Sequence, residues 1–362
     1  MDYMERALSL AGLALGNVSP NPAVGTVIVK DGSLIAEGYT QPPGSAHAEV
    51  VALQQAGNEA RGATMYVTLE PCCHFGRTPP CTQAIVESGI AEVHIATLDS
   101  NPLVSGKGRA ELEAARIDTY LGEHEDEARQ LNEAYIKFIT TGLPFVAAKF
   151  AMSLDGKIAT SSGDSRWISG EKSRERVHQL RRVVDAIMVG VNTVLRDDPQ
   201  LTARDEKGQP MERQPVRVIV DSQARTPTTA RLFGEPGRTI VATTSAVPRD
   251  RVDKLRQVGA EVLMLPISDW MVDLKALMQE LGTREITSVL AEGGSTLFGS
   301  VFEQGLVDKV IAFVAPIIIG GVEAKAAVGG EGAEKIAQAL RLNRVSIERL
   351  GDDVMVCGYV RS

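Results

Sequence analysis

Two stretches of sequence decide the fold of the first half: His47-Ala48-Glu49, and Glu70-Pro71-Cys72-Cys73-His74-Phe75-Gly76-Arg77-Thr78-Pro79-Pro80-Cys81. The pattern predicts that His47 begins a helix, that Cys72 follows a strand, and that Cys81 lies in the first turn of another helix. One imidazole and two thiolates form a zinc site with three protein ligands and an open fourth position, as in catalytic zinc sites. These residues therefore predict a zinc-dependent enzyme.

Glu49 stands two residues from the predicted ligand His47. Zinc turns its bound water into hydroxide near neutral pH, and Glu49 would carry a proton from that water to a departing amine. Zinc deaminases share the signature H-x-E…P-C-x-x-C, in which the glutamate is the general acid and base. This chain departs from the signature at the second cysteine, because the eight residues 73–80 separate Cys72 from Cys81.

Two other interpretations of the cysteines stay open. Cys73 or His74 would close the zinc site as a fourth ligand, or the cysteines would lie on a buried turn without a metal. A glutamate beside the ligand histidine has no role in a purely structural site, which favours the catalytic interpretation. Three of the four cysteines (72, 73, 81 and 357) fall within ten positions, which indicates metal binding before disulfide formation.

The first half alternates strands and helices, which predicts a sheet flanked by helices. Asp31-Gly32 supplies a hairpin turn between the first two strands. Gly142-Leu143-Pro144 is the predicted boundary between a domain at 1–143 and a domain at 144–362. The predicted strands are 24–29, 34–38, 64–69, 93–97 and 118–121, and the predicted helices are 2–15, 47–55, 80–88, 109–115 and 124–140.

The second half is predicted to form another α/β domain with its own sheet. Its polar segment 203–214 is the best candidate for a mobile loop. The predicted strands are 145–152, 186–190, 216–220, 239–242, 261–265, 288–291, 309–314, 345–350 and 354–360, and the predicted helices are 173–184, 251–258, 270–281 and 295–304.

The composition is that of an ordinary soluble protein, with 44% hydrophobic and 23% charged residues. The charge is uneven, since residues 1–143 hold 9 Lys and Arg against 18 Asp and Glu, and the remainder holds 29 against 28. An acidic first half argues against binding to a nucleic-acid backbone.

The longest apolar run, 310–319, is too short to span a membrane, and the N-terminus lacks a signal-peptide pattern, so we expect a cytoplasmic protein.

A glycine turn follows a predicted strand in the stretch Leu290-Ala291-Glu292-Gly293-Gly294-Ser295-Thr296-Leu297. Glycines let the backbone approach a ligand, and the N-terminus of the following helix offers N–H groups to an anion, so a pyrophosphate fits here. The stretch is not the G-x-G-x-x-G fingerprint, and an ordinary strand-to-helix turn is the alternative.

The first half resembles the deaminase half of the bifunctional riboflavin-biosynthesis deaminase/reductases. The resemblance rests on residues 19–25, 47–49 and 70–81, and the eight-residue insert has that family's own spacing. It implies a cytidine-deaminase-like three-layer α/β/α domain that deaminates 2,5-diamino-6-ribosylamino-4(3H)-pyrimidinone 5′-phosphate. By this resemblance the zinc ligands are His47, Cys72 and Cys81, the proton donor is Glu49, and the substrate contacts are Asn21, Arg77 and Asn101.

Two positions depart from the family pattern: Thr40, where many members have histidine, and Cys73, where serine is commoner. The asparagines also fit plain turn positions, and Arg77 also fits solvated surface.

The second half resembles the reductase half of the same family, so the resemblance covers essentially the whole chain. It rests on residues 148–159, 163–168, 190–194 and 197–202. It implies a dihydrofolate-reductase-like α/β domain in which NADPH reduces the ribosyl group of 5-amino-6-(5-phosphoribosylamino)uracil to ribityl. By this resemblance the cofactor contacts are Ala151, Trp167, Thr193, Asp197, Ser222, Gly294, Ser295, Thr296, Leu297, Phe298 and Gly299, and the substrate contacts are Lys149, Ser165, Arg181, Leu201, Arg204 and Glu292.

Several of these residues have simpler interpretations. Arg181 and Arg204 suit a phosphate anchor, yet Arg181 also fits a solvated helix face. Trp167 also fits a core position, and Lys149 a salt bridge. No residue indicates the 2′-phosphate contact that would separate NADPH from NADH, and none indicates the reductase's proton donor.

The alternative functions are a nucleoside or tRNA deaminase with an accessory nucleotide-binding domain, and a non-catalytic binding protein that keeps the fold. The acidic first half counts against the former, and the intact His47, Glu49, Cys72 and Cys81 against the latter. We expect a phosphorylated pyrimidine as substrate, with neither nucleic acid nor membrane as partner. We also expect a homo-oligomer, because the edge strands of a small reductase sheet favour pairing.

Overall fold

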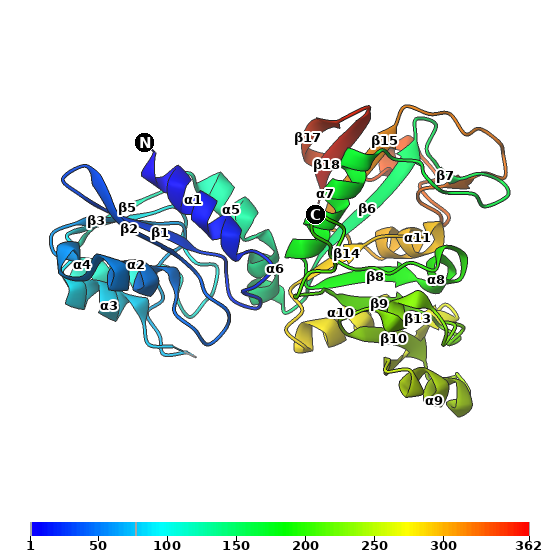
Figure 1. Ribbon diagram of the computed structural model, residues 1–362, viewed down its shortest axis with the longest axis horizontal. Coiled ribbons are helices and arrows are strands. Elements are labelled where there is room, and N and C mark those ends of the chain that lie inside the picture. The colour runs from blue at the N-terminus through cyan, green and yellow to red at the C-terminus, as the bar shows by residue number, and fades with distance from the viewer. Residues whose placement is uncertain (1, 77, 362) are drawn as a thin grey trace. The chain divides into compact units, whose positions relative to one another are not determined.

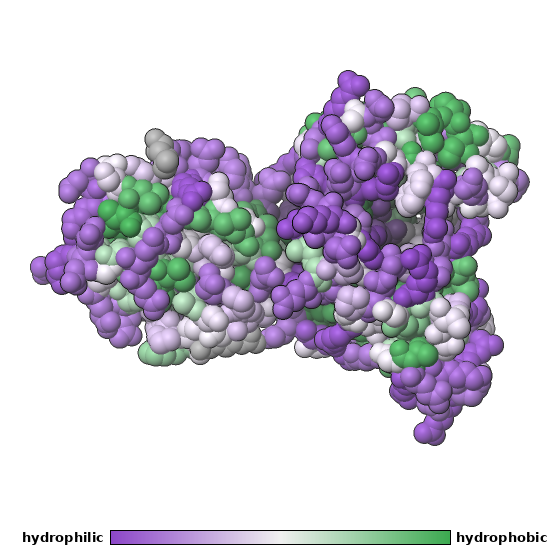
Figure 2. Space-filling model, in the orientation of Figure 1, coloured by the Kyte–Doolittle hydropathy of each residue, from purple (hydrophilic) through white to green (hydrophobic). Residues whose placement is uncertain are grey.

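The structure is a computed structural model that describes residues 2–76 and 78–361. Its contacts divide the chain into two compact units, Met1–Leu143 and Pro144–Ser362, and each has its own sheet (Figure 1). Figure 2 shows a mainly hydrophilic surface with separate apolar patches. No helix among the described residues has both the length and the apolar character that crossing a bilayer requires.

The first unit is a five-stranded sheet with helices on both faces. Its strands are β1 (Gly25–Lys30), β2 (Ser33–Tyr39), β3 (Thr64–Val67), β4 (Glu92–Ile95) and β5 (Asp118–Leu121), and its helices are α1 (Tyr3–Ala14), α2 (Ala48–Ala56), α3 (Cys81–Ser88), α4 (Lys107–Ala114), α5 (Glu125–Leu131) and α6 (Glu133–Thr141). The strand order is β2-β1-β3-β4-β5. β1 is antiparallel to β2 and β3, whereas β3, β4 and β5 are parallel.

The alternation of side chains along β1 creates the two cores of this unit. Val27 and Val29 join buried residues of α1 and α5 in one cluster, whereas Ile28 joins buried residues of α2, α3 and α4 in the other. Successive side chains of a strand point to opposite faces, so the two clusters lie on opposite sides of the sheet. Figure 1 shows the same separation of the helices, which confirms the three-layer α/β/α arrangement.

The second unit is built on a nine-stranded sheet. Its main strands are β6 (Phe145–Ser153), β8 (Ala186–Gly190), β9 (Val216–Val220), β10 (Thr239–Thr244), β11 (Glu261–Leu265), β14 (Ser288–Ala291), β15 (Lys309–Ala315), β17 (Leu342–Leu350) and β18 (Asp353–Val360). Two small ribbons pair β7 (Lys157–Ala159) with β16 (Lys325–Ala326), and β12 (Ile267–Ser268) with β13 (Met271–Val272). The helices are α7 (Glu171–Val183), α8 (Val191–Asp197), α9 (Arg249–Gln257), α10 (Leu274–Thr283) and α11 (Ser295–Glu303).

The strand order of the large sheet is β11-β10-β9-β8-β14-β6-β15-β18-β17. The strands from β11 to β15 are parallel, and β18 and β17 add an antiparallel edge. Val177 of α7 and Leu255 of α9 belong to the cores on one face. Phe298 of α11 contacts Phe150 edge-on on the other face, with ring centroids 5.6 Å apart. The carboxyl ends of the parallel strands thus meet at one edge, where α/β sheets bind ligands.

Two predicted helices differ from the structure. The predicted helix 124–140 is two helices, because Asn132 lies between them and its buried side-chain amide pairs with the N–H and C=O of Ala23 at 2.8 and 2.9 Å. The predicted helix 270–281 begins only at Leu274, because the preceding residues form the β12–β13 hairpin and Asp273 caps the helix by accepting from the Lys275 and Ala276 amides. Short elements such as β7 and α8 were not predicted from the periodicity.

Helix α1 packs closely on β1 at Gly25, which leads to a test of the fold. A Cβ atom there would lie 1.9 Å from the carbonyl oxygen of Ala7, so we expect Gly25→Ala to lower the free energy of unfolding by about 3 kcal/mol. Gly12→Ala is the control, because no atom lies within 4 Å of the added carbon, and alanine in this helix should stabilise by up to about 1 kcal/mol. Urea unfolding followed by circular dichroism measures the free energy of unfolding of both variants. Equal values for the two variants would contradict the close packing of α1 on β1.

Candidate active sites

The first site brings together His47, Cys72 and Cys81, whose ligand atoms all lie within 4.8 Å of one another. Nδ1 of His47 lies 3.5 Å from the Cys72 sulfur and 3.3 Å from the Cys81 sulfur. His47 immediately precedes α2, and Cys81 is the first residue of α3. A nitrogen and two sulfurs at this spacing are the donor set of a zinc ion, so the residues present fit that metal.

Neighbouring groups orient these side chains. The Thr78 hydroxyl lies 3.2 Å from Nε2 of His47, and such a contact to the far nitrogen fixes a ligand imidazole. The Cys81 backbone N–H donates to the Cys72 sulfur at 3.3 Å. The hydrogen bond from the Cys81 thiol lowers the pKa of Cys72, and the same bond, with burial, raises the pKa of Cys81. The lowered pKa of Cys72 favours its thiolate, which is the ligand form that zinc requires.

Glu49 lies in the first turn of α2 with only 4% of its surface exposed. Burial raises the pKa of its carboxyl group to about 7, and the negative charge of Cys72 adds to the rise. A hydrogen bond joins the carboxyl group to Cys81. A carboxyl group with a pKa near 7 both accepts and donates protons at physiological pH.

Cys73 and His74 do not join the metal-ligand cluster found among residues 2–76 and 78–361. The Cys73 thiol points to the carbonyl oxygen of Leu103 at 3.9 Å, and burial raises the pKa of this thiol. The described residues thus offer three ligands and not four, as in an open catalytic site.

The predicted substrate residues of this half lie on two loops. Asn101 follows β4, and its side-chain oxygen accepts from the Leu103 amide at 3.0 Å, while its side chain also hydrogen-bonds to Tyr135. Asn21 donates its backbone N–H to the carbonyl oxygen of Val18. It lies two residues before Ala23, whose backbone N–H donates to the side-chain oxygen of Asn132. Arg77 lies outside the described residues. Thr40 is buried and accepts from the Val24 amide at 3.0 Å, so its hydroxyl has a structural role.

Sequence reasoning missed the carboxylate of Glu70, which organises the loop beside the zinc cluster. Glu70 is 3% exposed and accepts backbone N–H groups of Asp99, Gly106 and Arg109 at 3.2, 2.9 and 3.0 Å. The only sequence signal was its position one residue before Pro71-Cys72. Burial of a carboxylate is tolerated when backbone donors satisfy it, so this group fixes the 99–109 loop against the Cys72 turn.

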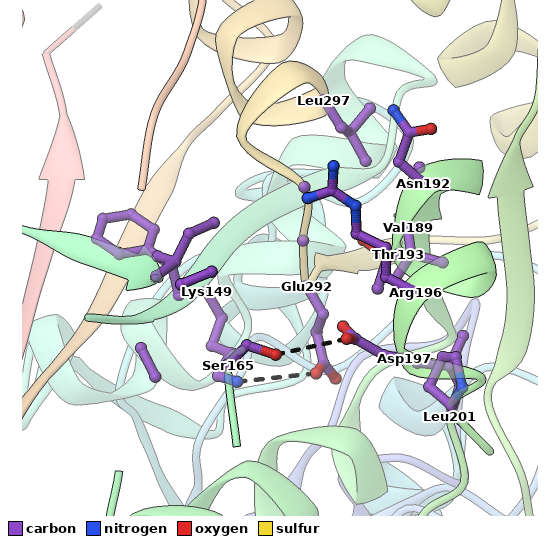
Figure 3. A pocket seen from close by; sticks show the side chains of 18 of the residues that line it. Lys149, Ser165, Val189, Asn192, Thr193, Arg196, Asp197, Leu201, Glu292 and Leu297 are labelled. Carbon is purple, nitrogen blue, oxygen red and sulfur yellow. Dashed lines mark hydrogen bonds and ion pairs between the residues drawn. The ribbon is translucent and has the colours of Figure 1, made fainter. Parts of the chain in front are cut away.

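The second site is a cavity of about 840 Å³ in the second unit. It lies at the carboxyl ends of β14 and β8 and at the start of α11, and its walls include Gly293, Gly294 and Thr193. Gly293 and Gly294 have φ values of 154° and 92°, which favour glycine. Figure 3 shows Leu297 and Asn192 toward one end of the cavity, and Ser165 and Glu292 toward the other.

All but two of the predicted reductase residues line this cavity. The predicted residues found there are Lys149, Ala151, Ser165, Trp167, Arg181, Thr193, Asp197, Leu201, Arg204, Glu292, Gly294, Ser295, Thr296, Leu297 and Phe298. Ser222 does not line it, and its hydroxyl accepts from the Val272 amide at 3.0 Å. Gly299 also does not line the cavity. It lets α11 lie close to Gly329, because an added Cβ atom at Gly299 would lie 2.7 Å from the carbonyl carbon of Gly329.

Glu292 is the centre of a buried ion cluster in the wall of the cavity. Arg181 donates to both its oxygens, from Nε at 2.6 Å and from Nη2 at 2.9 Å, and Nζ of Lys149 lies 3.9 Å away. The two cations keep the pKa of Glu292 below its ordinary value despite burial, whereas burial lowers the pKa of Lys149. Arg181 is therefore not on a solvated helix face, and Lys149 does form the salt bridge considered for it.

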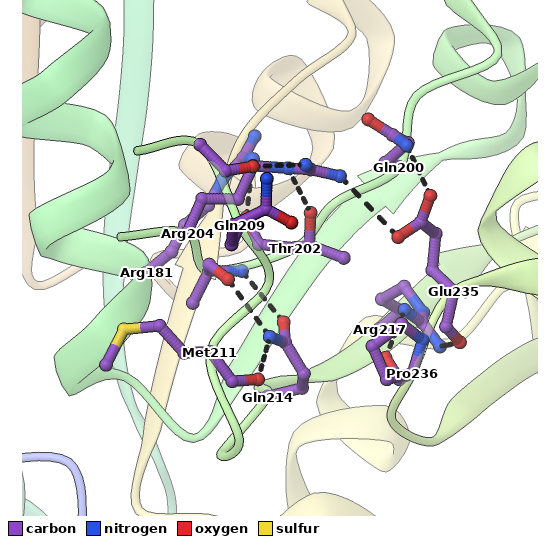
Figure 4. Close-up of polar contacts among 12 residues, drawn as sticks. Arg181, Gln200, Thr202, Arg204, Gln209, Met211, Gln214, Arg217, Glu235 and Pro236 are labelled. Atoms are coloured by element: carbon purple, nitrogen blue, oxygen red, sulfur yellow. Dashed lines mark hydrogen bonds and ion pairs between the residues drawn. The ribbon is translucent and has the colours of Figure 1, made fainter. Parts of the chain in front are cut away.

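Arg204 lies on the segment 203–214, which is tied down by side-chain hydrogen bonds (Figure 4). Gln214 accepts from the Ala203 amide at 2.8 Å and donates to the carbonyls of Ala203 and Met211 at 3.0 and 2.7 Å. Arg204 donates to Thr202 and Gly208 and lies 3.5 Å from Glu235. Hydrogen bonds within the segment thus hold the loop that was expected to be mobile, because its polar side chains bond to its own backbone.

Trp167 is 72% exposed at the wall of the cavity and is not a core residue. The guanidinium of Arg174 stacks on its ring at 4.8 Å, which holds the indole in place. The Ser165 hydroxyl donates to the Asp197 carboxylate at 3.5 Å.

Two family models match the chain: residues 144–356 match the RibD C-terminal domain, and residues 1–97 match the cytidine and deoxycytidylate deaminase zinc-binding region. With the His/Cys/Cys cluster, these matches define a bifunctional enzyme, a zinc deaminase joined to a reductase. The riboflavin biosynthesis protein RibD of Actinobacillus pleuropneumoniae is 45% identical over 358 residues, which cover 98% of this chain and 94% of that protein. The chain therefore belongs to the RibD family of deaminase/reductases in riboflavin biosynthesis.

Other relatives agree with this assignment. RibD of Escherichia coli is 42% identical, with 97% of each chain covered. The structure of Acinetobacter baumannii RibD matches with a TM-score of 0.88 at 40% identity and covers 99% of this chain and 98% of that chain. A diaminohydroxyphosphoribosylaminopyrimidine deaminase/5-amino-6-(5-phosphoribosylamino)uracil reductase from Thermotoga maritima matches with a TM-score of 0.85 at 38% identity, with 99% and 98% covered. The predicted fold class, bifunctional activity, zinc and NADPH are confirmed.

The contacts of Glu70 lead to a test of the first site. Glu70→Gln replaces one acceptor oxygen by an NH₂ group that faces backbone donors, so we expect the free energy of unfolding to fall by about 2 kcal/mol. Glu87→Gln is the control, because Glu87 is exposed and accepts only from Gln83 among the described contacts. Urea unfolding measures the difference, and a Glu70→Gln protein as stable as the control would show that the loop does not depend on this carboxylate.

Proposed function

We propose that His47, Cys72 and Cys81 hold zinc and that Glu49 moves the proton during deamination of 2,5-diamino-6-ribosylamino-4(3H)-pyrimidinone 5′-phosphate. The observation that supports this most is the buried Glu49 carboxyl group beside three converging ligand atoms. Zinc, when bound, supplies Lewis-acid activation of a water molecule.

Glu49 would act twice in this reaction. It accepts a proton as the water oxygen bonds to the ring carbon that carries the amine, and it passes that proton to the adjacent ring nitrogen. It then carries the remaining proton from the new hydroxyl group to the amine nitrogen, so that the carbon–nitrogen bond breaks, ammonia leaves, and a carbonyl group remains on the ring. The NH₂ groups of Asn21 and Asn101 are proposed to read acceptor atoms of the substrate, and Arg77 to pair with its phosphate.

We propose that the cavity of the second unit binds NADPH along α11 and the substrate beside Glu292. NADPH supplies the hydride that reduces C1′ of the open-chain ribosylamine. The main-chain N–H groups at the start of α11 suit the pyrophosphate of the cofactor. Arg181 keeps two N–H groups beyond those that bond to Glu292 and Thr202, so with Arg204 it is proposed to anchor the substrate phosphate. Ser222 and Gly299 stay proposed cofactor contacts from the resemblance alone.

The boundaries 1–143 and 144–362 are proposed for the deaminase and reductase domains, and the division of contacts after Leu143 supports them. The cytoplasmic location and the absence of nucleic-acid and membrane partners stay predictions.

We propose that a second copy of the chain pairs at the exposed edge strand β17. This strand ends the order of the large sheet, and its Val345 and Ile347 side chains are 52% and 72% exposed. Exposed edge strands pair readily with other chains, and a strand that pairs antiparallel with its own copy satisfies two-fold symmetry.

The role of Glu49 is tested by Glu49→Gln, which removes the proton carrier and keeps the shape. We expect deamination to fall by at least about 100-fold. We expect the zinc content to stay unchanged. We also expect NADPH oxidation to stay unchanged when the deaminated intermediate is supplied. Glu59→Gln, on the exposed turn after α2, is the control. Loss of both activities in a folded Glu49→Gln protein would refute two independent sites.

The pairing proposal is tested by light scattering on the purified chain of 38.7 kDa. We expect twice this mass for the unchanged protein and the single mass for Ile347→Glu, because pairing would bring the like charges of the two copies together on one face of the joined strands. Ile336→Glu, at a position with 86% exposure, is the control and should keep the double mass. A single mass for the unchanged protein, or a double mass for both variants, would contradict pairing at β17.

A further inference from the structure

The hydroxyl group of Tyr135 lies beside the loop that carries Asn101, the proposed substrate contact that follows β4. Tyr135 belongs to α6, and its ring is part of the buried core cluster that includes Ile28 and Leu112. Packing within this cluster fixes the ring, and a buried tyrosine hydroxyl usually finds a hydrogen-bond partner. Tyr135 therefore offers a polar group at a fixed place in the first unit.

Asp99 takes the hydrogen of this hydroxyl. The Tyr135 O–H group donates to the Asp99 carboxylate, with 2.9 Å to Oδ1 and 3.2 Å to Oδ2. Burial raises the pKa of Tyr135, and the charge of Asp99 adds to the rise, so the hydroxyl keeps its proton. Asp99 is 5% exposed, and its backbone N–H donates to Glu70 at 3.2 Å. The acceptor of the tyrosine proton is thus held by the same carboxylate that organises the 99–109 loop.

Asn101 contacts both members of this pair. Its backbone N–H donates to Oδ1 of Asp99 at 2.8 Å, and its side chain hydrogen-bonds to Tyr135. The hydrogen of the Tyr135 hydroxyl is already given to Asp99, so the hydroxyl oxygen is an acceptor toward Asn101. The side-chain NH₂ group of Asn101 is therefore the donor in this contact.

These bonds give the side-chain amide of Asn101 one orientation. Its oxygen accepts from the Leu103 amide at 3.0 Å, and its NH₂ group donates to Tyr135. A half-turn of the amide would set the NH₂ group against the Leu103 N–H, and the amide oxygen against a hydroxyl oxygen that has no hydrogen to offer. An NH₂ group carries two hydrogens, so one N–H is left for an acceptor atom of a ligand.

We propose that Tyr135 is a positioning residue of the deaminase, which holds the side-chain amide of Asn101 with one N–H toward an acceptor atom of the pyrimidinone ring. This inference rests on the proposed contact between Asn101 and the substrate. A side chain that is oriented before the substrate arrives loses less conformational entropy on binding. Without the hydroxyl, the preference for the binding orientation of the amide weakens, so Tyr135 acts on substrate binding and not on the zinc ligands.

The test is the steady-state rate of deamination of the diaminopyrimidinone phosphate by the full chain with zinc bound. Tyr135→Phe keeps the ring in the core and removes the hydroxyl, so we expect KM to rise about 5-fold, as for the loss of one hydrogen bond. We expect kcat to change by less than about 2-fold, and the zinc content to stay unchanged. Tyr120→Phe is the control, because Tyr120 is 52% exposed on β5, and it should leave KM unchanged.

A double variant separates positioning from a purely structural role. Asn101→Ala should raise KM about 10-fold, and Tyr135→Phe should add little in the Asn101→Ala background because both act on one contact. An equal rise in KM from Tyr135→Phe in both backgrounds would overturn the proposal. So would an unchanged KM for Tyr135→Phe beside a raised KM for Asn101→Ala. If Asn101→Ala leaves KM unchanged, the proposed substrate contact itself fails, which is a distinct result.

Discussion

Both sites depend on one constraint, the ending of parallel strands at a common edge of a sheet. In the first unit β3 and β4 are parallel neighbours, so the Cys72 turn after β3 lies beside the Asp99–Asn101 turn after β4. In the second unit β6, β14, β8 and β9 end together and place the glycine turn of α11 between the proposed substrate and cofactor ends. Strand direction thus brings together loops that are far apart in sequence at each site, and helices α2, α3 and α7 supply His47, Cys81 and Arg181.

Buried carboxylates then fix the loops that this edge brings together. Glu70 is satisfied by three backbone amides, and Glu292 by a bidentate arginine and a lysine. An isolated buried charge is costly, so removal of any one partner would leave an uncompensated group. The loops are therefore held in place before substrate or cofactor binds, and preorganisation of this kind is what orientation and proton transfer require.

Much of this arrangement was predictable from sequence because it follows local patterns. The His47, Glu49, Cys72 and Cys81 spacing predicted the cluster, and the alternation of strand-like and helix-like segments predicted nearly every long strand. The break at Asn132 was not predictable, because it depends on a hydrogen bond to Ala23, more than a hundred positions away. The hairpin before α10 was missed because apolar residues 270–272 continue the helical period of the following segment. The Arg181–Glu292 pair was missed because nothing in sequence indicates which charges meet across a cavity.

The most direct test of the account is a coupled assay on the purified chain with its zinc content measured in parallel. The diaminopyrimidinone phosphate is supplied with NADPH, and NADPH oxidation is followed with and without a chelator. The account predicts about one zinc per chain and NADPH oxidation that stops when zinc is removed and resumes when the deaminated intermediate is added. Bound zinc with deamination but no NADPH oxidation, even with the intermediate supplied, would contradict the claim that one chain carries both activities.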